Sequence, residues 1–244
     1  MELTRRISTA AAITWRFRFH LLCALVVIGL WDTPLVKPFR VLVVLVHEAC
    51  HAAASLVSGG QVVQLRTHWD ESGMTLSHGG YFPLISAAGY VGSALLGALL
   101  LYSGMWPRLQ RLLLFVVGCG AAVLVLLYTP FDGLDFYFGM VAGLALAVAA
   151  MYSSRLGKMA AGGLGVMLCL YSLYDFRSDL WSQPQATDAG LLAQHLGLPW
   201  LAYPIALSWV LVSLGAMYWA MKGLVLGRGG TVAEAPGDPP ESCE

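Results

Sequence analysis

Residues 41–58 read VLVVLVHEACHAAASLVS, an apolar stretch that contains three ionisable side chains, His47, Glu48 and His51. On a helix, positions i and i+4 share a face, so the two imidazoles can bind one metal ion. A charged group at the centre of a membrane helix costs about 2.5–3.5 kcal/mol. Three such groups within five residues therefore favour a metal site over a chance match.

The composition of the whole chain is that of a membrane protein. Of its 244 residues, 58% are hydrophobic and 11% are charged, whereas soluble domains carry about 25% charged residues. Lys+Arg and Asp+Glu both number 14, so nucleic acid is not an expected partner and the lipid bilayer is. Long apolar runs, without the alternating segments of a barrel, predict an all-α polytopic protein with six to seven transmembrane helices. The cysteines form no CxxC pair, which argues against a cysteine zinc site.

The apolar runs define the expected order of elements. A run over 19–31 is too short for a full span, since about 20 residues are needed, and we expect it to be a retained anchor or an interfacial segment. The polar residues 61–80, centred on the turn signal Asp70-Glu71-Ser72-Gly73, predict a small β-hairpin. It follows the helix that carries the HExxH motif, His47-Glu48-x-x-His51. A short amphipathic helix is expected over 188–196. The remaining six spans are expected at 34–58, 82–104, 109–128, 131–152, 158–175 and 199–221.

One membrane domain over 34–222 is expected between two terminal segments. Residues 1–33 form a basic segment with the short apolar anchor, and the Gly-, Pro- and acid-rich residues 223–244 are expected to be disordered. If 19–31 does not cross, most lysines and arginines fall on one side, which the positive-inside rule assigns to the cytoplasm. The hairpin, the turn at 129–132 and the loop at 175–197 then meet on the other side. We expect an integral, multi-pass protein of a bacterial plasma membrane.

The HExxH motif itself predicts hydrolytic chemistry. Glu48 lies beside the two histidines, where it can take a proton from a water bound to the metal. Zn²⁺ lowers the pKa of such a water towards 7, which makes hydroxide available at neutral pH. A catalytic zinc site also needs a third protein ligand and an open position.

An HExxH motif inside a transmembrane helix resembles the site-2 protease family of intramembrane zinc metalloproteases, and most closely its short bacterial and plant branch of peptidase M50B-like proteins. The resemblance extends from about residue 40 to 222. It implies a Zn²⁺-dependent peptidase that hydrolyses peptide bonds in or near the transmembrane segments of membrane-protein substrates, with Glu48 as the catalytic base. The motifs that carry it are His47-Glu48-x-x-His51-Ala52, Ser58-Gly59-Gly60-Gln61-Val62, Gly73-Met74-Thr75 with His78-Gly79-Gly80, Ala88-Gly89-Tyr90-Val91-Gly92-Ser93, Tyr174-Asp175 with Asp179-Leu180, and Thr187-Asp188-Ala189.

The third metal ligand has three candidates. Better-known site-2 proteases use the aspartate of an Asn-Pro-Asp-Gly or Leu-Asp-Gly motif, and the nearest string here contains Asp132 followed by glycine. The short branch instead resembles this chain at Asp175 and Asp188. Asp175 ends an apolar span and needs a partner at membrane depth, so we rank it first. Asp132 is second, with a turn role as its alternative, and Asp188 is third, with a helix N-cap as its alternative.

Other readings of the sequence remain open at this point. A non-catalytic membrane protein on a protease scaffold would bind transmembrane partners, although it would not need Glu48. A metal transporter would need inverted repeats and broken helices, and the sequence contains no such repeat. The small residues of 88–93 fit close helix packing or substrate positioning equally well. The hairpin resembles the family's β element, whose edge can pair with an unwound substrate.

Overall fold

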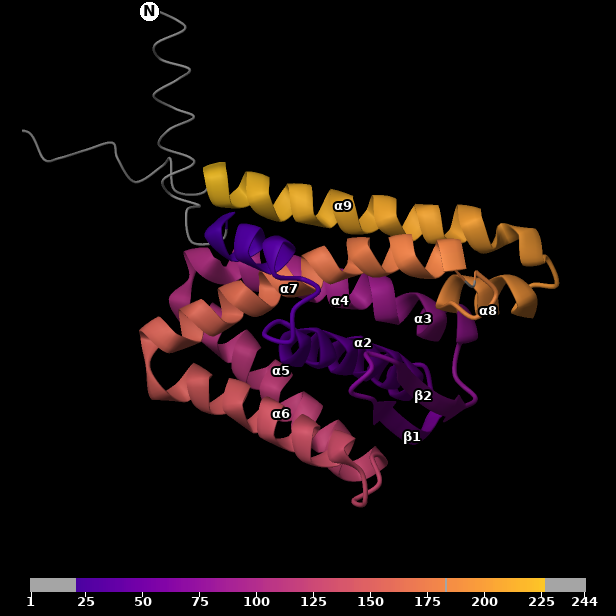
Figure 1. Ribbon diagram of the computed structural model, residues 1–244, viewed down its shortest axis with the longest axis horizontal. Helices are drawn as coiled ribbons and strands as arrows, with labels where there is room; N and C mark the ends of the chain where they lie inside the picture. Colours follow the sequence, from indigo (N-terminus) through magenta and orange to yellow (C-terminus); the bar gives the residue numbers. More distant parts are fainter. Residues whose placement is uncertain (1–20, 183, 227–244) are drawn as a thin grey trace, which may run out of the picture.

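The computed structural model describes residues 21–182 and 184–226, apart from the side chains of 172, 173, 175–182, 225 and 226. The described chain is a bundle of helices with one two-stranded antiparallel sheet (Figure 1). Residues 21–29 are helical. The further elements are α2 (Lys37–Val57), β1 (Gln61–Thr67), β2 (Gly73–His78), α3 (Phe82–Ala87), the π-helix η1 (Ala88–Gly92), α4 (Ser93–Tyr102), the 3-10 turn η2 (Ser103–Met105), α5 (Pro107–Tyr128), α6 (Leu134–Tyr152), α7 (Ser154–Ser182), α8 (Asp188–His195), the 3-10 turn η3 (Pro199–Leu201) and α9 (Ala202–Leu226).

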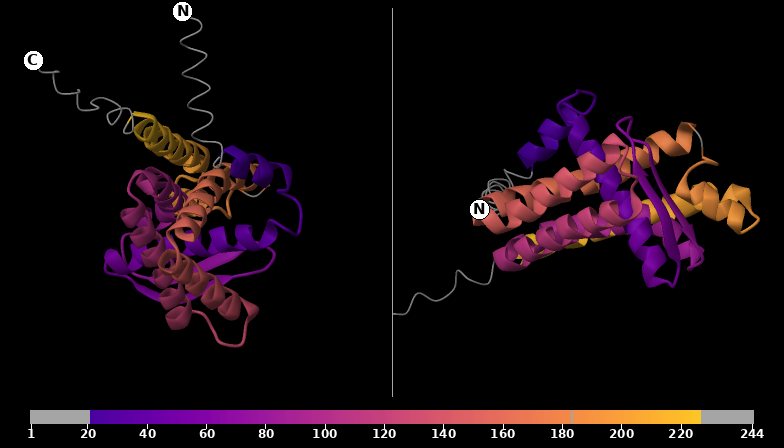
Figure 2. Two further views of the ribbon diagram at one scale, coloured as in Figure 1. Left: turned by 90° about the vertical axis from the view of Figure 1, so that its left-hand side faces the viewer. Right: turned by 90° about the horizontal axis from the view of Figure 1, so that it is seen from below.

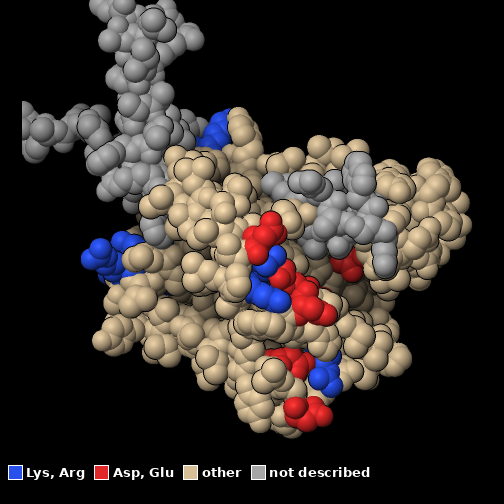
Figure 3. All heavy atoms as spheres, viewed as in Figure 1, with Lys and Arg blue, Asp and Glu red and all other residues tan. Residues whose placement is uncertain are grey.

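Five helical segments are long and apolar enough to cross a membrane, counted over the described residues. They confirm the expected spans that begin at 34, 82, 109, 131 and 199, and they occupy Lys37–Val57, Phe82–Met105, Pro107–Tyr128, Leu134–Tyr152 and Pro199–Leu224. The expected span at 158–175 lies within α7, whose last third is only partly described. Charged side chains gather over the middle and the lower part of the face seen in Figure 3, and most of that face is uncharged. These observations confirm a polytopic membrane protein.

The helix α2 crosses the interior of the bundle and carries the HExxH motif. Pro38 lies in its first turn, where a missing N–H costs nothing. The helix ends at Ser58, and Gly59 follows with a φ of 83°, a left-handed conformation that glycine adopts without strain. The Gly60 N–H donates to Ser55 O at 2.8 Å and turns the chain directly into β1. Three residues, 58–60, therefore separate α2 from the first strand of the sheet that packs on it.

The hairpin β1–β2 forms where the sequence predicts it. The strands pair from Gln61 with His78 to Thr67 with Gly73, with an irregularity between Val62 and Gln64. Both strands pack on α2, and the hairpin lies toward the same end of the molecule as α8 (Figures 1 and 2). The sheet thus lies beside the HExxH helix.

The connection between α5 and α6 anchors this sheet from the other side. The Thr129 hydroxyl donates to Leu65 O at 2.9 Å, and Arg66 Nη1 lies 3.3 Å from the buried Asp135 carboxylate. Helices α5 and α6 approach closely because Gly118 and Gly143 face each other: a Cβ at Gly118 would lie 2.6 Å from Gly143 O. This pair of helices therefore supports β1 at their connecting turn.

Several elements differ from the sequence prediction. The helix α7 runs from Ser154 to Ser182, so it extends beyond the expected span 158–175 at both ends and occupies the first part of the expected loop 175–197. The last helix, α9, continues to Leu226, past the expected end at 221, because Lys222 at a helix end can extend its ammonium to the membrane surface without ending the helix. Residues 82–105 are helical without a break in direction but contain the π-helix η1, which apolar composition does not signal.

The terminal segments are predicted at 1–33 and 223–244, and of these residues 1–20 and 227–244 lie outside the described residues. Residues 223–226, expected to be disordered, instead form the end of α9.

Candidate metal centre

The two histidines of the motif lie at the centre of α2. His47 is the middle residue of this 21-residue helix, about 15 Å from either end at a rise of 1.5 Å per residue. His47 and His51 are 9% and 6% exposed. Their Nε2 atoms lie 3.1 Å apart, so one helical turn aims both nitrogens at a single point, as the spacing of four predicts.

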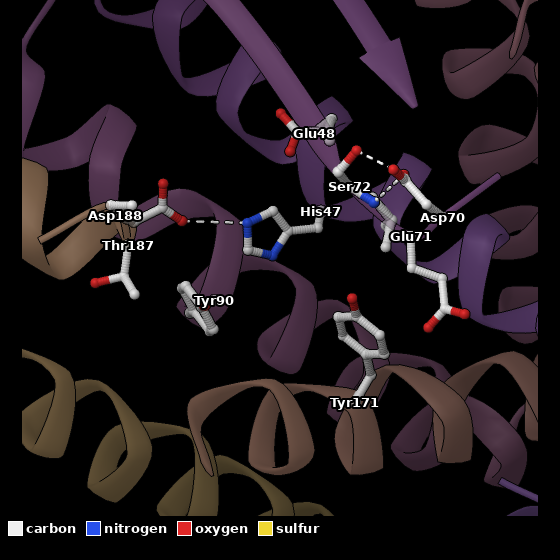
Figure 4. A pocket seen from close by; sticks show the side chains of 12 residues that line it. His47, Glu48, Asp70, Glu71, Ser72, Tyr90, Tyr171, Thr187 and Asp188 are labelled. Atoms are coloured by element: carbon white, nitrogen blue, oxygen red, sulfur yellow. Dashed lines mark hydrogen bonds and ion pairs between the residues drawn. The ribbon is translucent and has the colours of Figure 1, made fainter. Parts of the chain in front are cut away.

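A third ligand atom comes from the first residue of α8. Asp188 Oδ2 lies 3.2 Å from His47 Nε2 and 3.1 Å from His51 Nε2 (Figure 4). Thr187 is the N-cap, since its hydroxyl oxygen accepts the Gly190 N–H at 3.1 Å. The Asp188 carboxylate is therefore free of the capping role and points at the histidines. Burial alone would raise the pKa of Asp188, but the two histidines beside its carboxylate outweigh burial and hold that pKa below its ordinary value.

The three ligand atoms fit a tetrahedral metal ion. Two ligands that each lie about 2.1 Å from a tetrahedral ion are about 3.4 Å apart, close to the 3.1–3.2 Å separations observed here. Among the described residues, His47, His51 and Asp188 are the group of side chains that can hold an ion together. Two imidazole nitrogens and one carboxylate oxygen leave a fourth position open, which is the pattern of a catalytic zinc site.

The π-helix η1 leaves room at this centre. A Cβ on Gly89 would lie 2.3 Å from His51 Nε2 and 2.4 Å from His47 Nε2, so the backbone touches the ligands and only glycine fits. The ring of Tyr90 lies edge-on to His47, with centroids 4.9 Å apart. π-Bulges are frequent at functional sites, and this one brings a helix backbone against the ligand nitrogens.

The short helix α3 orients two of the three ligands. His51 Nδ1 lies 2.6 Å from Ile85 O, and because a carbonyl only accepts, this contact puts the proton on Nδ1 and leaves Nε2 free to bind a metal. The next residue, Ser86, donates its hydroxyl to Asp188 O at 2.7 Å. Such outer partners fix the orientation of metal ligands. Adjacent residues of α3 thus hold ligands from α2 and α8.

Glu48 lies between the metal ligands and the hairpin. It is 6% exposed, and the Thr75 hydroxyl of β2 donates to its Oε2 at 2.7 Å. A cavity of about 370 Å³ contains His47, Glu48 and Asp188 in its wall, and its other lining residues come from α2, the hairpin turn, η1, α7 and the segment before α8. Figure 4 shows the Tyr171 hydroxyl pointing into this space. The volume is within the range of about 300–1,000 Å³ that small-molecule pockets occupy.

The hairpin turn forms one wall of the cavity and is attached to the start of α2. Glu71, with a φ of 73°, pairs with Arg40 at 3.0 Å, and Lys37 lies 5.9 Å from the centroid of the Trp69 ring. Burial raises the pKa of Glu71 in spite of Arg40. These contacts keep the turn beside the open side of the centre.

Of the three candidate aspartates, the one that the structure places beside His47 and His51 is Asp188, which the sequence ranked third. Asp132 is exposed in the turn before α6, outside the group formed by the histidines and Asp188. Asp175 lies on α7, and its side chain lies outside the described residues. His68 and His78 are exposed on the hairpin, in agreement with surface roles.

Several of the residues that contact the site are not predicted from the sequence. Gly89 and Thr75 lie within motifs that carry the family resemblance, but nothing in the sequence alone assigns either of them to a ligand or to Glu48. Ser86 and Tyr171 lie in apolar runs, where a serine or tyrosine is ordinary. Their contacts with the site depend on the tertiary arrangement of α3 and α7.

Of the comparisons with known proteins, one identifies a family. Comparison with curated proteins and with solved structures gives no match. A family model described as Peptidase M50B-like matches residues 20–220, most of the chain and every residue of the centre. The chain therefore belongs to the peptidase M50B-like family, within the site-2 proteases that its motifs resemble.

Proposed function

We propose that this protein is a zinc-dependent intramembrane endopeptidase. The observation that carries the proposal is the buried Glu48 carboxylate, which shares a cavity with His47 and Asp188. Membership of a metallopeptidase family supports the same reaction class. The HExxH motif supplies two ligands and a base, and α8 supplies the third ligand.

Each residue of the centre has a defined part in the reaction. His47, His51 and Asp188 would hold Zn²⁺, which supplies a Lewis acid for the peptide carbonyl and lowers the pKa of water. Glu48 accepts a proton from the attacking water and returns it to the leaving amine, as a general base and then a general acid. Ile85 O and Ser86 orient His51 and Asp188. The helices around the centre limit the access of bulk water.

The position of the centre favours a substrate that lies in the membrane. His47 is half-way along a candidate span, about 15 Å from each end. A peptide bond must therefore come to membrane depth to reach Glu48. We propose that the substrate is a membrane protein cut in or near a transmembrane segment.

Zinc content tests the first half of the proposal. Purified protein in detergent is expected to contain about one zinc per chain, and Glu48→Gln is expected to keep it, since Glu48 is not a ligand. Loss of zinc in His47→Ala, with a normal unfolding temperature in EDTA, would locate the ion at this centre. Zinc-free but folded wild-type protein after zinc addition would refute the metal site.

Cleavage tests the second half. Wild-type protein in proteoliposomes is expected to cut a single-span reporter whose transmembrane segment contains an Asn-Pro pair, and Glu48→Gln is expected to lose this activity. Asp132→Asn is the matched control, because it removes an exposed carboxylate outside the ligand group. Normal cleavage by Glu48→Gln would refute the mechanism. A cellular phenotype fully rescued by Glu48→Gln would favour a non-catalytic scaffold that binds transmembrane partners.

A further inference from the structure

Two residues of strand β2 face the proposed catalytic base. Gly73 and Thr75 are separated by two positions, so they lie on the same face of the strand. That face lies directly against Glu48 on α2. The contact joins the hairpin to the centre of the site, although the hairpin contributes none of the three ligand atoms described above.

The Thr75 hydroxyl contacts Glu48 at two points. It lies 2.7 Å from the carboxylate atom Oε2 and 3.0 Å from the main-chain oxygen. Both acceptors belong to one residue, so the hydroxyl ties the end of the side chain to a fixed distance from its own backbone. Hydrogen bonds to a charged acceptor are about twice as strong as neutral ones.

Gly73 limits the space around the Glu48 carboxylate from another direction. A Cβ at this position would lie 2.3 Å from Glu48 Oε1 and 2.7 Å from Cγ. The strand backbone therefore covers the side chain, and any larger residue would displace it. Glu48 and Gly73 line the cavity, whereas Thr75 is not among its lining residues. The threonine holds the carboxylate from behind and does not meet the substrate.

We propose that Thr75 is a positioning residue for the catalytic base, with Gly73 providing the space in which that base is held. The inference rests on the proposed function and extends it to the hairpin. A free glutamate side chain has three rotatable bonds, and ordering it costs conformational entropy. Strand β2, paired along its length with β1, orders the carboxylate before the substrate binds.

The test compares two substitutions of equal size on the two strands. Thr75→Val removes the hydroxyl that contacts Glu48. Thr67→Val is the control, because the Thr67 hydroxyl is buried without a hydrogen-bond partner among the described residues. We expect Thr75→Val to lower kcat by about 10–100-fold, the usual cost of losing an outer-shell partner, with KM and zinc content unchanged. Thr75→Ser is expected to restore kcat to within about threefold of wild type, and Thr67→Val to leave it unchanged.

The outcomes separate this inference from the proposed function. The substrate probe is the single-span Asn-Pro reporter in proteoliposomes. If wild type cuts it, Glu48→Gln does not, and Thr75→Val matches wild type in kcat, the positioning role is wrong while the protease remains. If Thr75→Val lowers kcat because the protein misfolds, the variant will also lose zinc and bind the reporter weakly. That result, together with a low kcat in Thr75→Ser, would overturn the inference.

A stability measurement tests the contact even if wild type cuts nothing. Thr75→Val is expected to lower the unfolding temperature in detergent by a few degrees when Glu48 is present. In a Glu48→Ala background the same substitution is expected to lower the unfolding temperature less, because the carboxylate acceptor is gone and only the main-chain oxygen of residue 48 remains. Equal losses in both backgrounds would show that the hydroxyl does not hold the carboxylate.

Discussion

Replacing Gly89 by alanine is the sharpest test of the metal centre. The added Cβ would lie 2.3 Å from His51 Nε2, 2.4 Å from His47 Nε2 and 2.6 Å from His47 Cε1. Non-bonded heavy atoms need about 3.5 Å, so both ligand nitrogens would have to retreat by about 1 Å. A metal site tolerates ligand displacements of about 0.2 Å. One methyl group would therefore separate the two histidines from a shared ion.

The expected magnitude is a loss of at least about 100-fold in zinc affinity, or about 2.8 kcal/mol. We would measure it by competition with a fluorescent zinc chelator and by zinc per chain in purified protein. Gly120→Ala on α5 is the matched control, since a Cβ there meets nothing within 4 Å. That control should bind zinc normally and be equally stable or slightly more stable, because alanine is favoured over glycine in a helix by up to about 1 kcal/mol.

The zinc-free unfolding temperature distinguishes loss of the ion from loss of the fold. Ligand binding stabilises a protein, so zinc should raise the unfolding temperature of wild type and of Gly120→Ala, but not of Gly89→Ala. All three proteins should unfold cooperatively in EDTA. Wild-type zinc affinity in a folded Gly89→Ala protein would refute the close approach of η1 to the ligands, and with it the argument that the π-helix serves the centre.

Three further substitutions probe the ligands and their supports. Asp188→Ala should remove zinc while Asp132→Ala keeps it, as measured by zinc per chain. The opposite result would show that Asp132, and not Asp188, is the third ligand. Ser86→Ala should lower zinc affinity by about 10–100-fold, as outer partners of metal ligands do, and an unchanged chelator titration would refute its orienting role. Asp135→Asn leaves Arg66 without its 3.3 Å partner and should cost about 1.5–3 kcal/mol in unfolding free energy, with zinc still bound; no change in stability would contradict the anchoring of β1.

The helical spans could be predicted from the sequence because hydropathy alone determines them. The predicted run 109–128 corresponds to α5 at Pro107–Tyr128, and the predicted hairpin centre Asp70–Gly73 is the observed turn. Both features depend on local composition. The π-helix η1 could not be predicted in this way, because one extra residue in a helical turn changes neither the hydropathy nor the length of the span.

The two histidines and Glu48 could be predicted because one helical turn brings them together. Asp188, the proposed third ligand, is 137 residues beyond His51 along the chain, and three aspartates are compatible with the motifs. Thr187 and Asp188 are adjacent, and both residue types are good N-caps. The structure assigns the cap to Thr187, which releases the carboxylate of Asp188 for the histidines. The sequence contains both residues but does not say which one caps the helix.

The hairpin connects a turn far from the histidines to Glu48, the proposed catalytic base. Arg66–Asp135 and the hydrogen bond from Thr129 to Leu65 O attach β1 to the α5–α6 connection, β1 pairs with β2, and β2 holds Glu48 through Thr75. The Asp132 turn that resembles a ligand motif is part of this connection. Loss of the Asp135 or Thr129 contacts should therefore lower kcat with zinc retained, whereas the exposed Asp132 carboxylate is not part of them. Damage to α3 or α8 should instead lower zinc affinity, because the proposed base and the proposed metal ligands are supported by different parts of the fold.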